Sequence, residues 1–240
     1  MNLPADEAAQ PRAPRAGFAL PRDILIAPAR AFAAIKARPE WLPAALIVLV
    51  LSVAGTILAA PALAHVMNAA VAPSHAAGSN ISVASVDAAT KQELLQLFFN
   101  QTLFQLAAWG LTGMVLTTAS RLRGQATSFA TYFSLAANCG VTTAIGFALE
   151  AFVIRLRDPN SYANLNQFNT AFPLTLAVLD PHGSTTQVAF LAQYDIFFLW
   201  TGLLVAYGYM AISGEKPVRA LFLAFGIAFS LSLIGVLVQP

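Results

Sequence analysis

Residues 42–60 read LPAALIVLVLSVAGTILAA, a run of 19 residues without a charged side chain. A helix needs about 20 mostly apolar residues to cross the hydrocarbon core of a bilayer. Four further stretches of similar character follow, at 94–119, 128–154, 190–212 and 218–238. The sequence therefore predicts an all-α fold, a polytopic transmembrane helical bundle with five spans.

The composition supports the same conclusion. Hydrophobic residues make up 58% of the 240 residues and charged residues only 10%, against about 45–50% and about 25% in an average soluble domain. So few charges cannot cover a water-facing surface. The composition therefore argues against a soluble enzyme.

One alternative concerns the first apolar run. Ala62-Leu63-Ala64, just after it, resembles a signal-peptidase site. Signal peptides, however, have short charged starts and apolar cores of roughly 7–15 residues. Here 41 residues precede a longer core, so we expect the run to be retained as a membrane span.

The basic residues predict the orientation of the chain. Cytoplasmic loops of membrane proteins carry an excess of Lys and Arg. In a five-span topology one side holds ten of the 13 basic residues and the other holds Lys91, Arg155 and Arg157. The ten are Arg12, Arg15, Arg22, Arg30, Lys36, Arg38, Arg121, Arg123, Lys216 and Arg219. We therefore expect a cytoplasmic N-terminus and a C-terminus outside.

Two parts of the chain are distinguished by pattern. Residues 1–19 are rich in Pro, Ala and Arg and are expected to form a disordered cytoplasmic tail, with the membrane domain over 20–240. At the start of that domain, Ile24, Leu25, Phe32 and Ile35 fall roughly at helical spacing, and Pro28 suits a helix start. This pattern predicts a short amphipathic helix in the cytoplasmic interface. A cytoplasmic extension that contacts nothing is the alternative.

Small and polar residues recur inside the predicted spans. Helices in a bilayer associate through close packing and interhelical hydrogen bonds, so these residues should mark the inward faces. They are Gln96, Asn100, Gln101 and Gln105 in the second span, Ser134, Asn138, Thr142 and Gly146 in the third, and Gly226 and Ser230 in the fifth. A polar pathway for a solute is the alternative, although pathways usually need ionisable residues near mid-membrane.

The sequence shows no pattern that indicates catalysis or a bound cofactor. His65, His75 and His182 fall in outer loops without metal-ligand spacing, and Cys139 is the single cysteine. There is no Gly-rich phosphate loop and no nucleophile elbow. We expect no enzyme activity, no cofactor, no metal and no nucleic-acid partner.

Four charged residues should meet at the outer ends of the third and fourth spans. Glu150, Arg155 and Arg157 close the third span, and Asp195 lies near the start of the fourth. A charge just inside the hydrocarbon is costly unless it is paired or reaches water. We expect Asp195 to pair with Arg155 or Arg157, directly or through Tyr194 and water, with Trp200 deeper in the span. Full solvation in the headgroup zone is the alternative.

Three short motifs resemble the Yip (Ypt-interacting protein) domain family, in its bacterial form. They are Ile26-Ala27-Pro28-Ala29-Arg30-Ala31-Phe32 with Arg38-Pro39-Glu40-Trp41 before the first span, Arg123-Gly124-Gln125-Ala126-Thr127-Ser128-Phe129 before the third, and Tyr194-Asp195-Ile196-Phe197-Phe198-Leu199-Trp200 in the fourth. The resemblance covers roughly residues 22–238. Gln125 stands where the family commonly has a second Gly.

The resemblance implies a five-spanning protein of the bacterial inner membrane that is not an enzyme. Eukaryotic members look like adaptors in vesicle traffic and carry a long acidic N-terminal domain, which the 41 residues before the first predicted span do not resemble. We expect an adaptor or assembly factor that acts through helix–helix association with other membrane proteins or with itself, in contact with membrane lipids. The alternatives are a small-solute transporter or channel, or an accessory subunit of a larger complex.

Overall fold

The structure is a computed structural model that describes residues 17–76 and 83–238. Within these residues the chain forms helices and short 3-10 turns, and it contains no strand beyond one isolated bridge between Thr175 and Asp195. The five long helices are α3 (Leu42–Ala76), α4 (Val83–Arg121), α5 (Phe129–Leu156), α8 (Ile196–Ser213) and α9 (Pro217–Val238). The short ones are α1 (Ala19–Ile26), α2 (Pro28–Ala37), α6 (Leu165–Asn169) and α7 (Thr185–Ala192), with 3-10 turns at Pro159–Ser161 and Leu176–Leu179.

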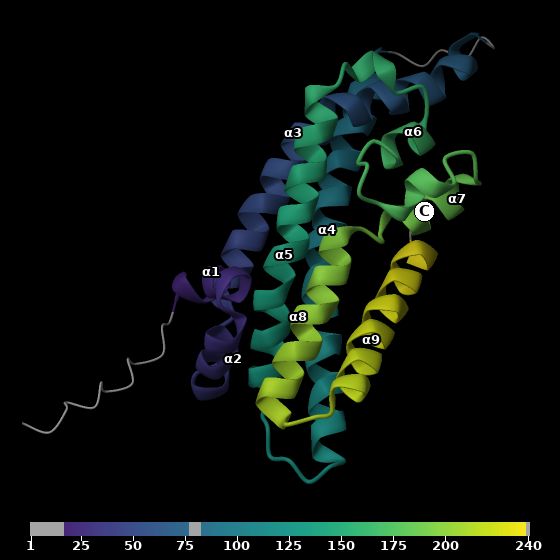
Figure 1. The fold of residues 1–240 in the computed structure, drawn as a ribbon. Coiled ribbons are helices and arrows are strands. Elements are labelled where there is room, and N and C mark those ends of the chain that lie inside the picture. The colour runs from purple at the N-terminus through teal and green to yellow at the C-terminus, as the bar shows by residue number, and fades with distance from the viewer. Residues whose placement is uncertain (1–16, 77–82, 239–240) are drawn as a thin grey trace, which may run out of the picture.

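The bundle is built around α5. This helix packs against α3, α4 and α8, and α9 packs on the outer side of α8 (Figure 1). The α4–α5 and α8–α9 loops lie together at one end of the bundle (Figure 1). The short helices α6 and α7 lie near the other ends of α8 and α9, away from these loops (Figure 1). Because α5 is surrounded, the polar residues on it lie among other helices.

Four helices of the described part are long and apolar enough to cross a membrane, over Leu42–Val66, Phe129–Leu156, Ile196–Ser213 and Pro217–Ile234. The predicted second span, 94–119, lies inside α4, which is not among these four. The structure thus supports a multi-pass membrane protein with an all-helical bundle, and the fifth span stays a proposal.

Local capping explains where two of these helices begin and end. The Ser128 hydroxyl accepts a hydrogen bond from the Thr131 amide and starts α5. Gly214, with φ of 67°, ends α8 in the left-handed conformation, and Pro217 begins α9. This short connection makes α8 and α9 a tight helical hairpin.

The apolar run 190–212 does not form one helix. It is divided between α7, which ends at Ala192, and α8, which begins at Ile196. Asp195 is the N-cap of α8, and its carboxylate accepts a hydrogen bond from the Phe198 amide at 2.6 Å. Hydropathy alone could not place this boundary, because the residues on both sides of the cap are apolar.

The N-terminal segment folds onto the bundle. Residues 20–38 form two helices, and Pro28 begins the second one as expected. Ile24, Phe32 and Ile35 are buried in the main core, with the Phe32 ring 5.3 Å from that of Tyr207. The alternative of an extension that contacts nothing is therefore wrong. Of the predicted tail 1–19, residues 1–16 lie outside the described residues.

The fifth span differs from the prediction. Gly226 and Ser230 of α9 are exposed and do not face the other helices. The core side of α9 is formed instead by Ala220, Ala224 and Ile227. The spacing of Gly226 and Ser230 predicted correctly that they share one face of α9. It could not indicate whether that face points into the bundle or away from it.

Candidate functional site

The polar residues of α5 lie inside the bundle. Ser134, Asn138 and Thr142 are each at most 2% exposed, and Gly146 is buried as well. Ser134 Oγ and Asn138 Nδ2 donate hydrogen bonds of 2.7 and 2.8 Å to the carbonyl oxygen of Glu40, just before α3. These two side chains therefore fix the start of α3 against α5.

Gly146 permits a close helix contact. A Cβ atom at this position would lie 2.7 Å from ring atoms of Phe197 in α8. A Cβ atom at Gly140, six residues earlier, would likewise lie close to Trp109 Nε1 and Gln105 Nε2 of α4. Glycine at these positions is explained by the packing of α5 against α8 and α4. The side chains of Gln96, Asn100 and Gln101, also predicted to face inward, lie outside the described part.

Some polar atoms of this region have no hydrogen-bond partner. Trp109 Nε1, Asn138 Oδ1 and Thr142 Oγ are buried and unpaired among the described residues. Thr143 and Thr201, by contrast, join α5 to α8 through a hydroxyl hydrogen bond of 3.0 Å. The interior of the bundle is therefore polar in part, although none of these side chains lines either of the two hollows described below.

A polar clamp joins the α4–α5 and α8–α9 loops, which lie at the same end of the bundle (Figure 1). Arg123 in the α4–α5 loop pairs with Glu215 in the α8–α9 loop, and the Gln125 amide donates to the Ser213 carbonyl. The Glu215 side chain is only 2% exposed and also accepts a 2.8 Å hydrogen bond from the Lys216 amide. No local sequence pattern indicates this clamp, because its paired residues are 88 and 92 positions apart.

A second buried acid holds α1 to α2. Asp23 is 1% exposed and accepts hydrogen bonds from Arg22 Nη2 and Arg30 Nε, each at 3.0 Å. Burial raises the pKa of Asp23, but the hydrogen bonds and charges of the two arginines outweigh burial and leave the pKa below its ordinary value. Nothing in the sequence pattern distinguished Asp23 from a solvated charge.

The charged residues at the end of α5 and the start of α8 are arranged differently from the prediction. Asp195 caps α8, while Arg155 and Arg157 are exposed. No ion pair within 4.0 Å joins Asp195 to either arginine, although all three residues are described. Glu150 is partly exposed in the last third of α5. The structure therefore does not form the direct pair, and a coupling through water stays a prediction.

The two candidate tryptophans are exposed on the sides of the bundle. Trp41 precedes α3, and its ring lies 5.5 Å from that of Phe133 in an edge-on arrangement. Trp200 projects from α8, and it lines an apolar groove rather than packing in the core. Exposed rings on membrane helices contact lipid unless another protein covers them.

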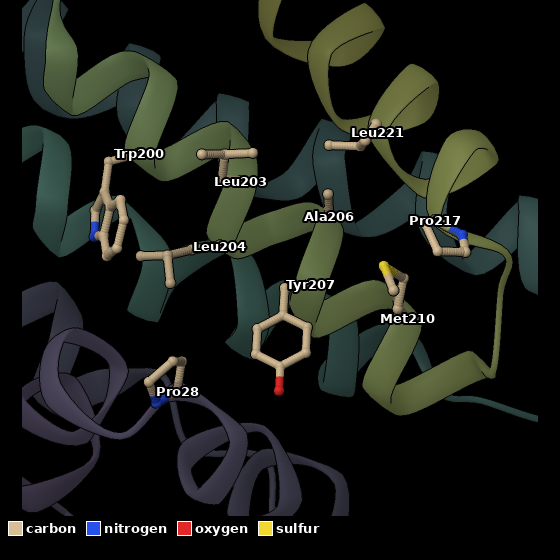
Figure 2. A pocket seen from close by; sticks show the side chains of 9 residues that line it. All are labelled: Pro28, Trp200, Leu203, Leu204, Ala206, Tyr207, Met210, Pro217 and Leu221. Carbon is tan, nitrogen blue, oxygen red and sulfur yellow. The ribbon is translucent and has the colours of Figure 1, made fainter.

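The groove beside Trp200 runs along α8. It has a cavity volume of about 260 Å³, and Figure 2 shows its nine lining side chains, which come from α2, α8 and α9. They are Pro28, Trp200, Leu203, Leu204, Ala206, Tyr207, Met210, Pro217 and Leu221. Apart from the Tyr207 hydroxyl and the indole nitrogen of Trp200, the lining contains no polar side-chain atom.

A second hollow lies in the segment between α5 and α7 and is polar. It measures about 530 Å³ and is lined by Arg157, Asp158, Ser161, Tyr162, Gln167 and Thr170. Within residues 17–76 and 83–238 no cluster of three or more His, Cys, Asp or Glu side chains is placed to hold a metal ion. The described residues thus form an apolar groove, two buried ion-pair clusters and a polar hollow.

Comparison with known proteins gives one match. A family model described as the Yip1 domain matches residues 22–238. No curated protein and no solved structure matches the sequence. The matched range begins in α1 and ends at the last residue of α9. Because it covers nearly the whole bundle, this integral membrane protein belongs to the Yip1 domain family.

Proposed function

We propose that this chain is a non-enzymatic adaptor or assembly factor that binds a transmembrane helix of another membrane protein through the outer face of α9. Five residues of α9 share that face, because they follow one another at helical spacing. They are Phe222, Gly226, Phe229, Ser230 and Leu233, and all five are exposed. This exposed face of α9 is the observation on which the proposal rests.

The shape of the face suits a second helix. Phe222 is 77% exposed and Phe229 51%, and between them a Cβ atom at Gly226 would meet no atom within 4 Å. The Ser230 hydroxyl donates a 2.8 Å hydrogen bond to the Gly226 carbonyl, so it stays close to the backbone. The result is a notch between large side chains. Small residues four apart allow the backbones of membrane helices to approach closely.

The position of α9 leaves this face free within the bundle. Helix α9 packs on α8 and touches α4 and α7, and it lies at the edge of the bundle (Figure 1). The Phe229 ring is held 6.2 Å from that of Phe190 and 6.4 Å from that of Tyr194. A fixed ring beside a notch supports a specific contact rather than general solvation by lipid.

The proposal includes a topology. We propose five spans in a bacterial inner membrane, with the N-terminus in the cytoplasm and the C-terminus outside. Helix α4 has 39 residues and a length of about 58 Å, ample for the hydrocarbon core of about 30 Å. The Arg123–Glu215 pair joins the α4–α5 and α8–α9 loops, which supports their location on one side of the membrane.

A photo-crosslinking experiment tests the contact. A photoreactive residue at position 229 should crosslink to a transmembrane segment of a partner protein, identified by mass spectrometry. The same residue at exposed Val53 of α3 should crosslink to lipid only. Gly226→Leu fills the notch and should abolish the protein crosslink. Gly110→Leu is the matched control, because a Cβ atom at Gly110 also meets no atom within 4 Å.

Other outcomes have defined meanings. A crosslink from position 229 to a second copy of this chain would identify self-association through the same face. Crosslinks to lipid alone at both positions, or an identical pattern in Gly226→Leu, would contradict the proposed adaptor surface.

Transport of a small solute is the second candidate function. The unpaired Trp109 Nε1, Asn138 Oδ1 and Thr142 Oγ favour it, because buried polar atoms in a membrane bundle often belong to a pathway. Solute flux into liposomes that contain the purified protein separates the two functions. Flux that Asn138→Leu abolishes would support transport and would count against a purely adaptor role.

A further inference from the structure

The apolar groove on α8 has the length of one leaflet of a bilayer. It extends from Trp200 to Met210, ten residues along α8 (Figure 2). At a rise of about 1.5 Å per residue the groove is about 15 Å long, half of a hydrocarbon core of about 30 Å. Met210 lies three residues before the end of α8 at Ser213, and Pro217 at the start of α9 also lines the groove, so the groove reaches the end of the bundle that holds the α8–α9 loop.

The end of the groove at that loop carries positive charge. Pro217 lines the groove, and the residue before it is Lys216, which is exposed. Arg219, in the first turn of α9, adds a second exposed charge at the same depth. The nearby acid, Glu215, is buried and paired with Arg123, so it does not neutralise Lys216. The positive charge at this end of the groove therefore favours binding of an anionic lipid headgroup.

The size of the groove decides between a lipid chain and a helix. A helix about 10 Å across and about 15 Å long would occupy on the order of 1,200 Å³, several times the groove volume of about 260 Å³. A single acyl chain is much thinner than a helix and has no polar groups to satisfy. The lining, which is apolar apart from one indole nitrogen and one hydroxyl, suits a chain of this kind.

The wall that α2 contributes is held in place. Pro28 lines the groove, and Phe32, one turn later, packs edge-on against Tyr207. Arg30 of the same turn is paired with buried Asp23 of α1. A groove with a fixed wall is present before a ligand arrives, which lowers the entropy cost of binding.

We propose that this groove binds one anionic phospholipid of the cytoplasmic leaflet, with an acyl chain along α8 between Trp200 and Met210 and the phosphate beside Lys216. The inference rests on the membrane location of the chain and, for the choice of leaflet, on the proposed topology, but not on the proposed adaptor role. It assigns to the groove a retained lipid, distinct from the exchanging lipids around the bundle.

Fluorescence quenching tests this site. The full chain is reconstituted with phosphatidylglycerol or phosphatidylcholine that carries bromine on the acyl chain, and Trp200→Phe defines the share of the quenching due to Trp200. Brominated phosphatidylglycerol should quench Trp200 more strongly at equal mole fraction. Lys216→Gln should lower the preference for the anionic lipid about fivefold. Arg155→Gln with Arg157→Gln removes two exposed charges at the opposite end and should leave it unchanged.

A groove variant separates this site from general surface charge. Leu203→Phe narrows the groove and keeps every charge, so the preference for phosphatidylglycerol should also fall. Equal quenching by the two lipids in the unmodified chain would overturn the proposal. So would a preference that survives Leu203→Phe, or one that the Arg155 and Arg157 variants reduce as much as Lys216→Gln. Both Lys216 and Leu203 are exposed, so these variants are expected to fold.

Discussion

At the scale of single residues, the two buried carboxylates are the unusual features of the molecule. Asp23 and Glu215 are almost inaccessible, and each is paired with at least one arginine. Buried charges are retained in proteins only when they are paired and hydrogen-bonded. Both acids lie where short segments meet the bundle, and we infer that their role is to fix those segments.

The Asp23 cluster predicts a pH-dependent stability. Asp23→Asn should lower the free energy of unfolding by about 1–3 kcal/mol at neutral pH, because charged hydrogen bonds to two arginines are weakened. The pKa of Asp23 is lowered in the folded state, so its contribution is present above the unfolded pKa and is lost as pH falls through the folded one. Unfolding in detergent should be measured at several pH values. The difference in unfolding free energy between Asp23→Asn and the unmodified chain should shrink below about pH 4. A difference that stays constant into acid would contradict this account.

Gly146 predicts an overpacking effect. A Leu at this position would drive atoms into the Phe197 ring, which already lies 2.7 Å from the place of a Cβ. We expect Gly146→Leu to destabilise the bundle by about 1–3 kcal/mol. Ala130→Leu, at an exposed position of the same helix, should be tolerated. Equal thermal stability of the two variants would show that this contact does not constrain the bundle.

At the scale of elements, the α8–α9 hairpin is fixed at both ends, by the clamp at one and by Asp195 at the other. Gly214 and Pro217 make the turn, and Arg123 with Gln125 ties it to the α4–α5 loop. The groove and the notch of α9 both lie on this hairpin. Their geometry therefore depends on the clamp and on the cap.

The clamp predicts unequal effects of its two members. Arg123→Gln leaves the Glu215 carboxylate buried without its partner and should cost about 2–3 kcal/mol, below the 3–5 kcal/mol of a fully buried pair because Arg123 is partly exposed. Glu215→Gln leaves an arginine that can reach water and should cost less. Thermal unfolding of the two variants in detergent measures the difference, and the reverse order would contradict the buried position of Glu215.

The cap predicts the result of a double-mutant cycle. Asp195→Ala should lower stability by about 0.5–2 kcal/mol through loss of the hydrogen bond to the Phe198 amide, whereas Asp195→Asn should keep most of it. The coupling of Asp195 with Arg155 or Arg157 should be near zero, since no direct pair forms. A coupling well above error would instead support the pair through Tyr194 and water.

The sequence predicts the long helices well because apolar length and the Gly and Pro stops are local properties. It places Ser134, Asn138 and Thr142 on one side of α5 for the same reason. It could not predict that Gly226 points outward, since periodicity defines a face but not its direction. The burial of Asp23 and the Arg123–Glu215 pair depend on contacts between distant segments, which no local pattern encodes.

At the scale of the whole molecule, the lengths of the elements agree with a bilayer. Helix α8 has 18 residues, about 27 Å, and connects the clamp at one end with Asp195 at the other. This length is close to the hydrocarbon thickness of about 30 Å. The charged residues thus lie where α8 would leave the membrane. We infer that the clamp is at the cytoplasmic surface and the outer loops, with α6 and α7, are on the other side.

The central claim is a five-span membrane bundle in which α4 crosses the membrane and the two clamped loops share the cytoplasmic side. Reporter fusions after the last residue test it most directly. With the N-terminus in the cytoplasm, an odd number of spans places the C-terminus outside. An alkaline phosphatase fused there should therefore be active, and a green fluorescent protein should be dark. The same reporters inserted in the α4–α5 loop, at Gly124, should give the opposite result. A bright fluorescent protein and an inactive phosphatase at the C-terminus would contradict the five-span account.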